Sequence, residues 1–158
     1  MHALNLDIGE LHCADKHICA VYENLGEIIE KLVRLNQINI AEDLSKIREI
    51  TKGLYFELNF KFIRRIIKKP IEEMSLKKLV EFAFDVLLYV DKVRKVRAGI
   101  HQASYKLLAT DLDEKTLEAT FIEFLKCIGN TYHIELHLLD FCQVIYKIIK
   151  RKEKKEKK

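Results

Sequence analysis

Two histidines, His133 and His137, stand four residues apart in the segment TYHIELHLLD, which has the apolar spacing of a helix. Residues at this spacing lie one above the other on a helix, so two imidazoles placed there can bind one metal ion. Asp140, one turn further on, completes the set of candidate metal ligands. A metal-binding helical enzyme or sensor is therefore one interpretation of this chain.

The rotational position of the two histidines argues against a buried metal centre. The apolar stripe of their segment passes through Ile134, Leu138 and Phe141. At about 100° per residue, His137 points away from this stripe, and His133 lies on the same outer side. A metal site in the core of a helix bundle needs ligands that project inward. We therefore expect both imidazoles to face solvent, and we predict no cofactor.

Few other residues suggest catalysis. The chain has no glycine-rich phosphate loop, no G-x-S-x-G motif and no repeated Glu-x-x-His pair. Glu135 lies on the apolar stripe of its helix, where a carboxylate is usually paired with a cation. His17 can reach the level of His137 and, with Glu135, extends the list of residues for the metal-binding alternative. The sequence favours a protein that is not an enzyme.

The cysteines and the apolar runs bear on the cellular compartment. The four cysteines contain no CxxC pair and no zinc-binding spacing, so we expect reduced thiols. Cys13 and Cys142 would meet if the first and last helices were antiparallel neighbours, and their pairing stays an open alternative. The start of the chain does not resemble a secretory signal, and no apolar run reaches the ~18 residues of a membrane span. We expect a soluble cytoplasmic protein.

Apolar residues recur at alternating steps of three and four, the pattern of helices that pack along a seam. Five glycines and one proline are too few for a turn-rich β fold. Short connections between long helices favour antiparallel neighbours. We predict an all-α fold, an up-down-up-down four-helix bundle of four long antiparallel helices, in one domain over 1–150 with a basic, disordered tail over 151–158. The helices are expected over about 5–36, 40–69 (ending at Pro70), 75–107 (with Ser75 as N-cap) and 112–150.

The segment LYFELNFKFI is ambiguous, because its apolar residues alternate as they do in a strand. No other segment offers it a β partner, and both flanks are helical, so we predict a helix that is apolar on more than one face. Such a helix has more aromatic surface than one core covers. Tyr55, Phe56 and Phe60 are therefore expected to be covered either by the rest of the fold or by a protein partner or a second copy of the chain.

Charge is distributed unevenly along the chain. Residues 1–60 carry a net charge of −4, residues 61–110 of +7, residues 111–146 of −5 and residues 147–158 of +6. In the predicted topology the end of the second helix, the start of the third and the tail meet at one pole, which would attract phosphate backbones of DNA or RNA. The candidate nucleic-acid-binding residues are Lys61, Arg64, Arg65, Lys68, Lys69, Lys77, Lys78, Lys150, Arg151 and Lys152.

These observations favour a non-enzymatic accessory or assembly subunit with a basic pole that contacts nucleic acid. The metal-binding bundle that uses His133 and His137 is one alternative. The other is a structural protein-interaction module in which the lysine-rich tail serves only for solvation.

Overall fold

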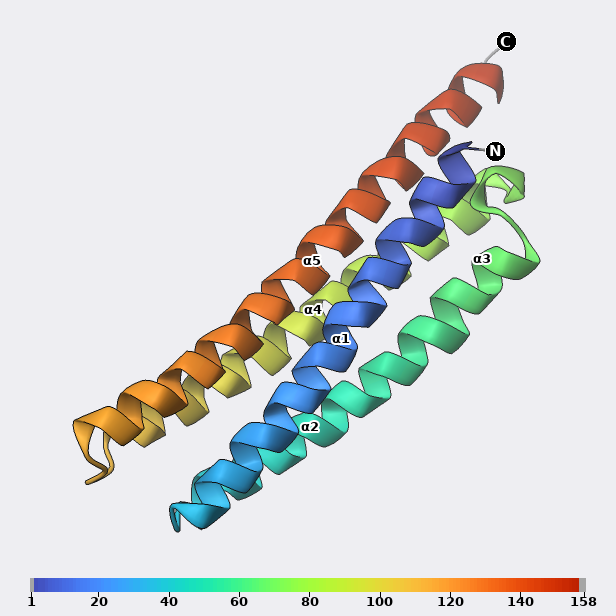
Figure 1. Ribbon diagram of the computed structural model, residues 1–158. Coiled ribbons are helices and arrows are strands. Elements are labelled where there is room, and N and C mark those ends of the chain that lie inside the picture. The colour runs from blue at the N-terminus through green and yellow to red at the C-terminus, as the bar shows by residue number, and fades with distance from the viewer. Residues whose placement is uncertain (1, 157–158) are drawn as a thin grey trace.

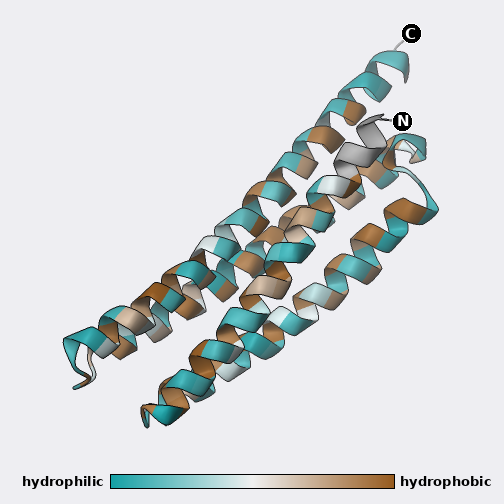
Figure 2. Cartoon of the chain, in the orientation of Figure 1, coloured by the Kyte–Doolittle hydropathy of each residue, from teal (hydrophilic) through white to brown (hydrophobic). Residues whose placement is uncertain are grey.

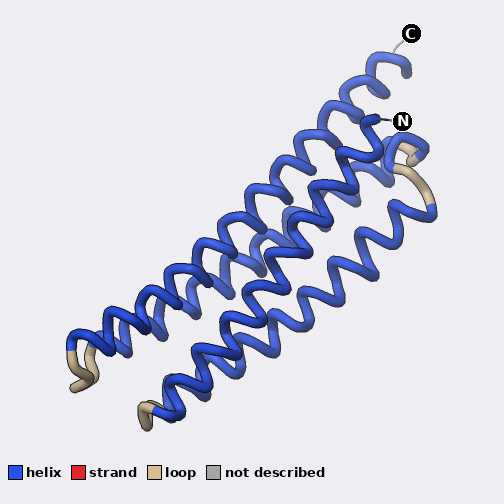
Figure 3. Tube along the Cα trace, in the orientation of Figure 1, coloured by secondary structure: helices blue, strands red, loops and turns tan. Residues whose placement is uncertain are grey.

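The computed structural model describes residues 2–156, and the side chains of residues 8–155. Over this range the chain is all-helical and contains no strand, which confirms the all-α prediction (Figure 3). The elements are α1 (His2–Arg34), α2 (Ile38–Glu57), the π-helix η1 (Leu58–Ile63), α3 (Arg64–Lys68), the short 3-10 helix η2 (Ile71–Glu73), α4 (Leu76–Leu108) and α5 (Glu114–Glu156).

α2, η1 and α3 follow one another without a break and form one continuous helix. Together with α1, α4 and α5 this gives four long helical segments, which lie side by side (Figure 1). α1 packs against α5 and α2, and α4 packs against the same two helices. The connections at 35–37 and 109–113 lie at one end of the molecule. The connection at 69–75 and the last turn of α5 lie at the other end (Figure 1).

The core is lined by the inward faces of all four segments. In α1 these residues follow the predicted steps of three and four, and each is at most 1 % exposed: Leu11, Ala14, Ile18, Val21, Leu25, Ile28 and Leu32. Burial of apolar area is the main favourable term in folding, so these continuous seams fix how the helices face one another.

The turn after α1 is a helix C-cap built on Asn36. Its φ of 60° is the left-handed conformation that asparagine tolerates better than most residues. The backbone N–H of Gln37 donates to the carbonyl of Leu32 at 2.8 Å, and that of Asn36 donates to Val33 at 3.0 Å. These two bonds satisfy carbonyls that the helix end would leave free, and the chain turns at residues 35–37, close to the predicted end of the first helix at about residue 36.

Side-chain caps mark the starts of the last two long helices. The Ser75 hydroxyl accepts a hydrogen bond from the backbone N–H of Lys78 at 3.3 Å, as predicted for an N-cap. Asp113 accepts from the backbone N–H of Thr116 at 3.2 Å and from its hydroxyl at 2.6 Å. These bonds from Thr116 lower the pKa of Asp113.

The ambiguous aromatic segment is helical, as predicted, but it contains the π-helix η1. Its buried residues Leu54, Leu58, Phe62 and Ile66 recur every four positions. In an α-helix each step of four rotates the side chain by about 40°, so such a stripe would turn out of the core. A π-helix makes i→i+5 hydrogen bonds and rotates less per residue. The wider turn therefore keeps these residues facing inward.

α5 extends beyond the boundary at residue 150 that the sequence suggested. It continues to Glu156, so residues 151–156 are helical, and its last turns are strongly hydrophilic (Figure 2). Lysine and glutamate have good helix propensity, and Lys150 lies 3.8 Å from Glu153 at the favourable i,i+3 spacing. No helix in the described part of the chain is long and apolar enough to cross a membrane.

Candidate functional site: a basic pole and a histidine cluster

One end of the molecule collects cations from segments far apart in the sequence. The end of α3, the start of α4 and the end of α5 all lie there (Figure 1). A groove of about 420 Å³ lies between the end of α5 and η2, which stands in the connection from α3 to α4. It is lined by Glu72 of η2 and by Ile148, Arg151, Lys152, Lys154 and Lys155 of α5. We call the following cations the basic pole: Lys61, Arg64, Arg65, Lys68, Lys69, Lys77, Lys78, Lys150, Arg151, Lys152, Lys154 and Lys155. Lys157 and Lys158 lie outside the described residues.

Most of the basic pole is open to solvent and unpaired. All of its side chains are exposed except those of Arg65 and Lys152, which are half-buried. Two of its lysines have a carboxylate partner, Lys61 with Glu57 at 3.9 Å and Lys150 with Glu153 at 3.8 Å. Over the described range the other cations of the pole have no carboxylate at ion-pair distance. Because nearby carboxylates leave most of these charges unneutralised, the basic pole produces a positive field at this end of the molecule.

An exposed aromatic pair borders the basic pole. The rings of Phe56 and Phe60 stack with centroids 6.1 Å apart, and the guanidinium of Arg64 lies 5.3 Å from the Phe60 centroid. Phe60 is 58 % exposed, whereas Tyr55 is half-buried against the core. Ile67 continues this apolar face toward the end of α3, and together with Phe56 and Phe60 it lines an open groove. The excess aromatic surface predicted from the sequence is therefore present at two of its three residues.

The second basic cluster, at Lys92, Arg94, Lys95 and Arg97 in the middle of α4, is largely neutralised. Lys92 contacts Glu57 at 3.1 Å. Arg94 and Arg97 both hold Glu135, at 3.1 and 2.8 Å, and the Arg97 guanidinium also lies 3.9 Å from the Tyr132 ring centroid.

Glu135 is thus a paired carboxylate, as its position on the apolar stripe suggested. Desolvation by burial raises the pKa of Glu135, but the hydrogen bonds and charges of Arg94 and Arg97 outweigh it and the pKa is lowered. A carboxylate that stays ionised between two cations is a structural partner.

The two histidines of α5 lie next to a third histidine, His17 of α1, so the expectation that both imidazoles face solvent holds only in part. His133 is exposed as expected, but the His137 side chain is only 26 % exposed. The ring of His17 lies between α1 and α5, with its centroid 4.7 Å from that of His133 and 5.7 Å from that of His137. His137 Nδ1 lies 2.7 Å from Glu10 Oε2. His137 points away from the core stripe of α5, but α1 packs beside α5 and covers this side of the helix. His137 is therefore half-buried against α1.

The three imidazoles do not converge on one point. Their planes are within 15–17° of parallel, so their nitrogen lone pairs point along separate planes. His17 Nδ1 is already engaged by Asn130 Oδ1 at 2.9 Å. Within the described residues no group of three histidine, cysteine, aspartate or glutamate side chains is arranged to hold a metal ion. Asp140 is exposed and lines a groove between α5 and α4 with Leu87.

All four cysteines are free. Burial raises the pKa of Cys127 to about 12 and that of Cys142 to about 11. Burial, with the nearby carboxylates of Asp15 and Glu23, also raises the pKa of Cys19. These three thiols are therefore protonated near neutral pH and are poor nucleophiles.

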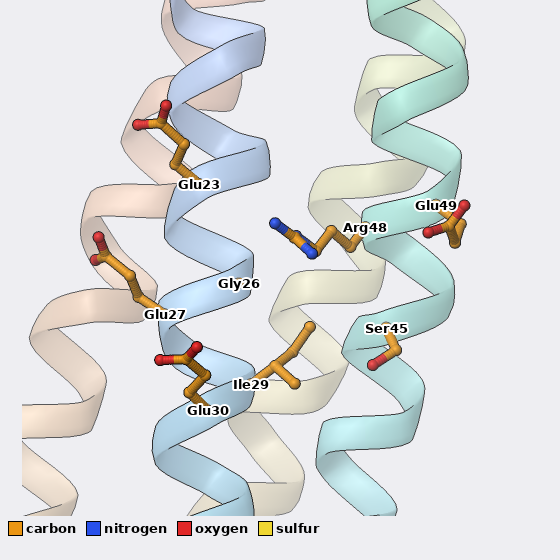
Figure 4. Close-up of a pocket in the computed structure, with 8 residues that line it drawn as sticks. All are labelled: Glu23, Gly26, Glu27, Ile29, Glu30, Ser45, Arg48 and Glu49. Atoms are coloured by element: carbon orange, nitrogen blue, oxygen red, sulfur yellow. The ribbon is translucent and has the colours of Figure 1, made fainter.

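A groove of about 510 Å³ lies between α1 and α2, and four of its eight lining residues are glutamates (Figure 4). Figure 4 shows Arg48 of α2 reaching toward Gly26 of α1. Arg48 Nε donates to the Tyr22 carbonyl at 3.0 Å, and its guanidinium lies 3.8 Å from the Tyr22 ring centroid. A Cβ at position 26 would come within 2.9 Å of Arg48 Nη2, so the glycine leaves room for this arginine. Arg48 therefore acts as a clamp between two helices.

Comparisons with models of known protein families, with curated proteins and with solved structures found no match to this chain.

Proposed function

We propose that this chain is a non-enzymatic accessory subunit, an antiparallel up-down-up-down four-helix bundle whose basic pole binds the phosphate backbone of DNA or RNA. The observation that carries the proposal is the meeting of three cationic segments at one end, with most of their charges unpaired. A protein that neutralises phosphates releases their counterions, and this release drives binding without sequence readout. The four free cysteines fit a reducing compartment such as the cytoplasm.

The contrast between the two basic clusters supports this assignment. The cluster on α4 is held by Glu57 and Glu135 and so has little charge to offer a polyanion. The basic pole keeps its charge available for an external partner. Solvation alone would not require cations from three separate segments to gather at one end.

The exposed rings of Phe56 and Phe60 add a second element to this surface. Base–aromatic stacking contributes about 1–3 kcal/mol per base in single-stranded complexes, and Arg64 beside Phe60 supplies a phosphate contact. We assign this aromatic pair to unpaired nucleotides or to the apolar face of a protein partner. Phe60→Ala separates the two uses, because it lowers affinity for a single strand and leaves affinity for a duplex unchanged when the rings stack on bases.

The proposal is tested by gel-shift binding to a duplex DNA, a duplex RNA and a single strand at low salt. The intact chain is expected to bind. A variant that lacks residues 150–158 and carries Arg64→Gln, Arg65→Gln, Lys68→Gln and Lys69→Gln is expected to lose this binding. Circular dichroism must show that the variant remains helical. Absence of binding by the intact chain at low salt would remove the polyanion role and leave the structural-module alternative.

Metal binding at the histidine cluster is the second candidate function, favoured by the third imidazole that α1 contributes. Rotation of the rings about χ2 would be needed before their nitrogens could reach the ~2.0–2.1 Å of zinc–nitrogen bonds. Calorimetric titration with Zn²⁺ tests it. Stoichiometric binding that His17→Asn and His137→Asn each abolish supports a site, and binding unchanged by both substitutions excludes it.

A further inference from the structure

The solvent face of α5 carries a second line of residues at helix-pairing spacing. Its buried face follows steps of three and four through Phe124, Cys127, Thr131, Ile134, Leu138, Phe141, Ile145 and Ile148. The residue two positions before each of these forms a second line with the same steps, which we call the outer seam: Ile122, Leu125, Gly129, Tyr132, Leu136, Leu139, Gln143 and Tyr146. Two positions correspond to about 200°, so the outer seam lies opposite the core face.

Five residues of the outer seam, Ile122, Leu125, Tyr132, Leu136 and Tyr146, are apolar or aromatic and exposed. Gln143 is polar, and Gly129 and Leu139 are half-buried, with Leu139 packed partly against the core. Leu125 is 65 % exposed and Leu136 is 57 % exposed. Single exposed leucines are ordinary, but a line of them at heptad spacing is the pattern of a helix that pairs with another helix. Gly129 leaves open space on this line, because a Cβ there would meet nothing within 4 Å. Leu139 and Tyr146 line a groove of about 500 Å³ with Leu87 of α4, which extends the apolar face sideways.

We propose that the outer seam pairs with the outer seam of a second copy of this chain, with the two α5 helices antiparallel and the two-fold axis at the level of residue 134. In this register the gap at Gly129 lies opposite Leu139 of the partner subunit, the exposed edge of a side chain that also packs against its own core. Leu125 lies opposite Gln143 of the partner subunit. Tyr132 lies opposite Leu136 of the partner subunit. Such an isologous pairing repeats every contact twice.

Charge complementarity identifies the occupant as a second copy. The outer seam continues in both directions with the same steps, to Glu118 and Lys115 at one end and to Lys150 and Glu153 at the other. In the proposed register Glu118 faces Lys150 of the partner subunit, and Lys115 faces Glu153 of the partner subunit. Each of these end positions therefore meets a residue of opposite charge when two outer seams pair antiparallel, so the seam is complementary to itself.

A flanking pair agrees with the same register. Lys126 and Asp140 both follow an outer-seam residue directly, and both are exposed. Antiparallel helices place such flanking positions beside one another, so Lys126 lies next to Asp140 of the partner subunit. Opposite charges at these positions set helix orientation in coiled coils.

Other pairings of the same helices are less favourable. A parallel dimer places Glu118 beside Glu118 of the partner subunit and Lys150 beside Lys150 of the partner subunit, so like charges meet at both ends. Shifting the antiparallel pair by one heptad in one direction buries Lys150 against Leu125 of the partner subunit. The opposite shift places Lys115 against Tyr146 of the partner subunit.

Sedimentation velocity of the full chain over a range of concentrations tests the dimer. The unmodified chain is expected to dimerise, and Leu125→Glu with Leu136→Glu is expected to give monomer. Ile50→Glu is the matched control, because Ile50 is also an exposed apolar residue, on α2, and its substitution is expected to leave the dimer intact. A chain that stays monomeric at all concentrations overturns the proposal, and so does dissociation by Ile50→Glu but not by the two outer-seam substitutions.

Exchange of charges tests the register without disturbing the apolar seam. Glu118→Lys alone and Lys150→Glu alone are each expected to raise the dimer dissociation constant about tenfold at low salt, because each creates like-charge contacts twice. The double variant Glu118→Lys with Lys150→Glu is expected to return to within about twofold of the unmodified chain. If the losses of dimerisation free energy in the two single variants simply add in the double variant, this register is contradicted. These measurements contain no nucleic acid, so they are independent of the function proposed for the basic pole.

Discussion

Arg97 shows how one side chain on α4 is held by several neighbours on α5. It donates to Glu135 at 2.8 Å and lies over the ring of Tyr132, while its Nη1 is buried without a partner in the described structure. An arginine with an unsatisfied buried nitrogen depends strongly on the contacts it retains.

Neutralising the partner of Arg97 is therefore expected to cost stability. Glu135→Gln should lower the free energy of unfolding by about 1–2 kcal/mol, since the hydrogen bond to a half-buried cation loses its charge. Asp91→Asn is the control. Asp91 meets Arg94 at 3.5 Å on the exposed surface, and its substitution should change stability by less than about 0.5 kcal/mol. Urea unfolding at pH 7 measures both, and equal effects would contradict the account.

The same pair predicts a pH dependence. Because the pKa of Glu135 is lower in the folded chain than in the unfolded chain, its contribution is present above the unfolded value and is lost as pH falls through the folded value. The stability gap between the unmodified chain and Glu135→Gln should therefore be constant near neutral pH and shrink below the ordinary glutamate pKa of 4.5. A gap that widens in acid would reverse this conclusion.

Thiol reactivity gives a second prediction at this scale. Cys13 is exposed, whereas Cys127 is fully buried and its pKa is raised to about 12. At pH 8 an alkylating reagent should modify Cys127 at least about a hundredfold more slowly than Cys13, because both thiolate formation and access are suppressed. Peptide mass spectrometry over time measures the two rates. Comparable rates in the folded chain would show that the α1–α5 boundary opens readily.

At the residue scale, residue type and helical phase predict a role that depends on the side chain's position along or around its own helix. Ser75 was identified as a cap from its type and position alone, and Glu135 as a paired carboxylate from its helical phase. The histidine cluster was missed, because its geometry depends on how far α5 turns toward α1. The signal available was the shared level of His17 and His137, which gives height but not rotation.

At the scale of elements, the heptad steps were sufficient to place the long helices. They could not reveal η1, because alternating apolar residues fit both a strand and a widened helical turn. What distinguishes the two is the set of contacts that this segment makes with α4. Phe62 packs edge-on against Phe82 and Tyr89, at centroid distances of 5.5 and 5.6 Å, and the Tyr89 hydroxyl donates to the Leu54 carbonyl at 2.6 Å.

A single-residue deletion tests whether η1 is one extra residue in an otherwise regular helix. Removing Lys61 leaves Leu54, Leu58, Phe62, Ile63 and Ile66 at steps of four, three, one and three, which is a regular α-helical stripe. This variant should unfold cooperatively with a midpoint within about 5 °C of the unmodified chain.

The control for that deletion removes an exposed residue from regular helix. Deleting Lys52 rotates everything after it by about 100° relative to the core, so it should lower the midpoint far more or abolish cooperative unfolding. Thermal melts followed by circular dichroism compare the two deletions. If the Lys61 deletion is as damaging as the Lys52 deletion, η1 is not a simple insertion.

At the scale of the whole molecule, the meeting of charges is a consequence of topology. Helix lengths matched along the bundle bring the end of α3 and the end of α5 to the same pole, although they are far apart in sequence (Figure 1). Charge counts and turn positions were enough to anticipate this meeting. They did not show that the α4 cluster is neutralised by Glu57 and Glu135, which requires the rotations of α2 and α5.

The salt dependence of nucleic-acid binding tests the role of the basic pole most directly. For a duplex DNA, the logarithm of the affinity should fall linearly with the logarithm of salt concentration, with a slope of about −0.9 for each phosphate contact. Substituting Arg64, Lys68, Lys69 and Arg151 by glutamine should bring this slope closer to zero by about 0.9 per lost contact. Substituting the exposed cations Arg34, Lys46, Lys52 and Lys95 removes the same charge elsewhere and should leave the slope almost unchanged. Equal slopes in the two variants, or no binding by the intact chain at low salt, would contradict the account.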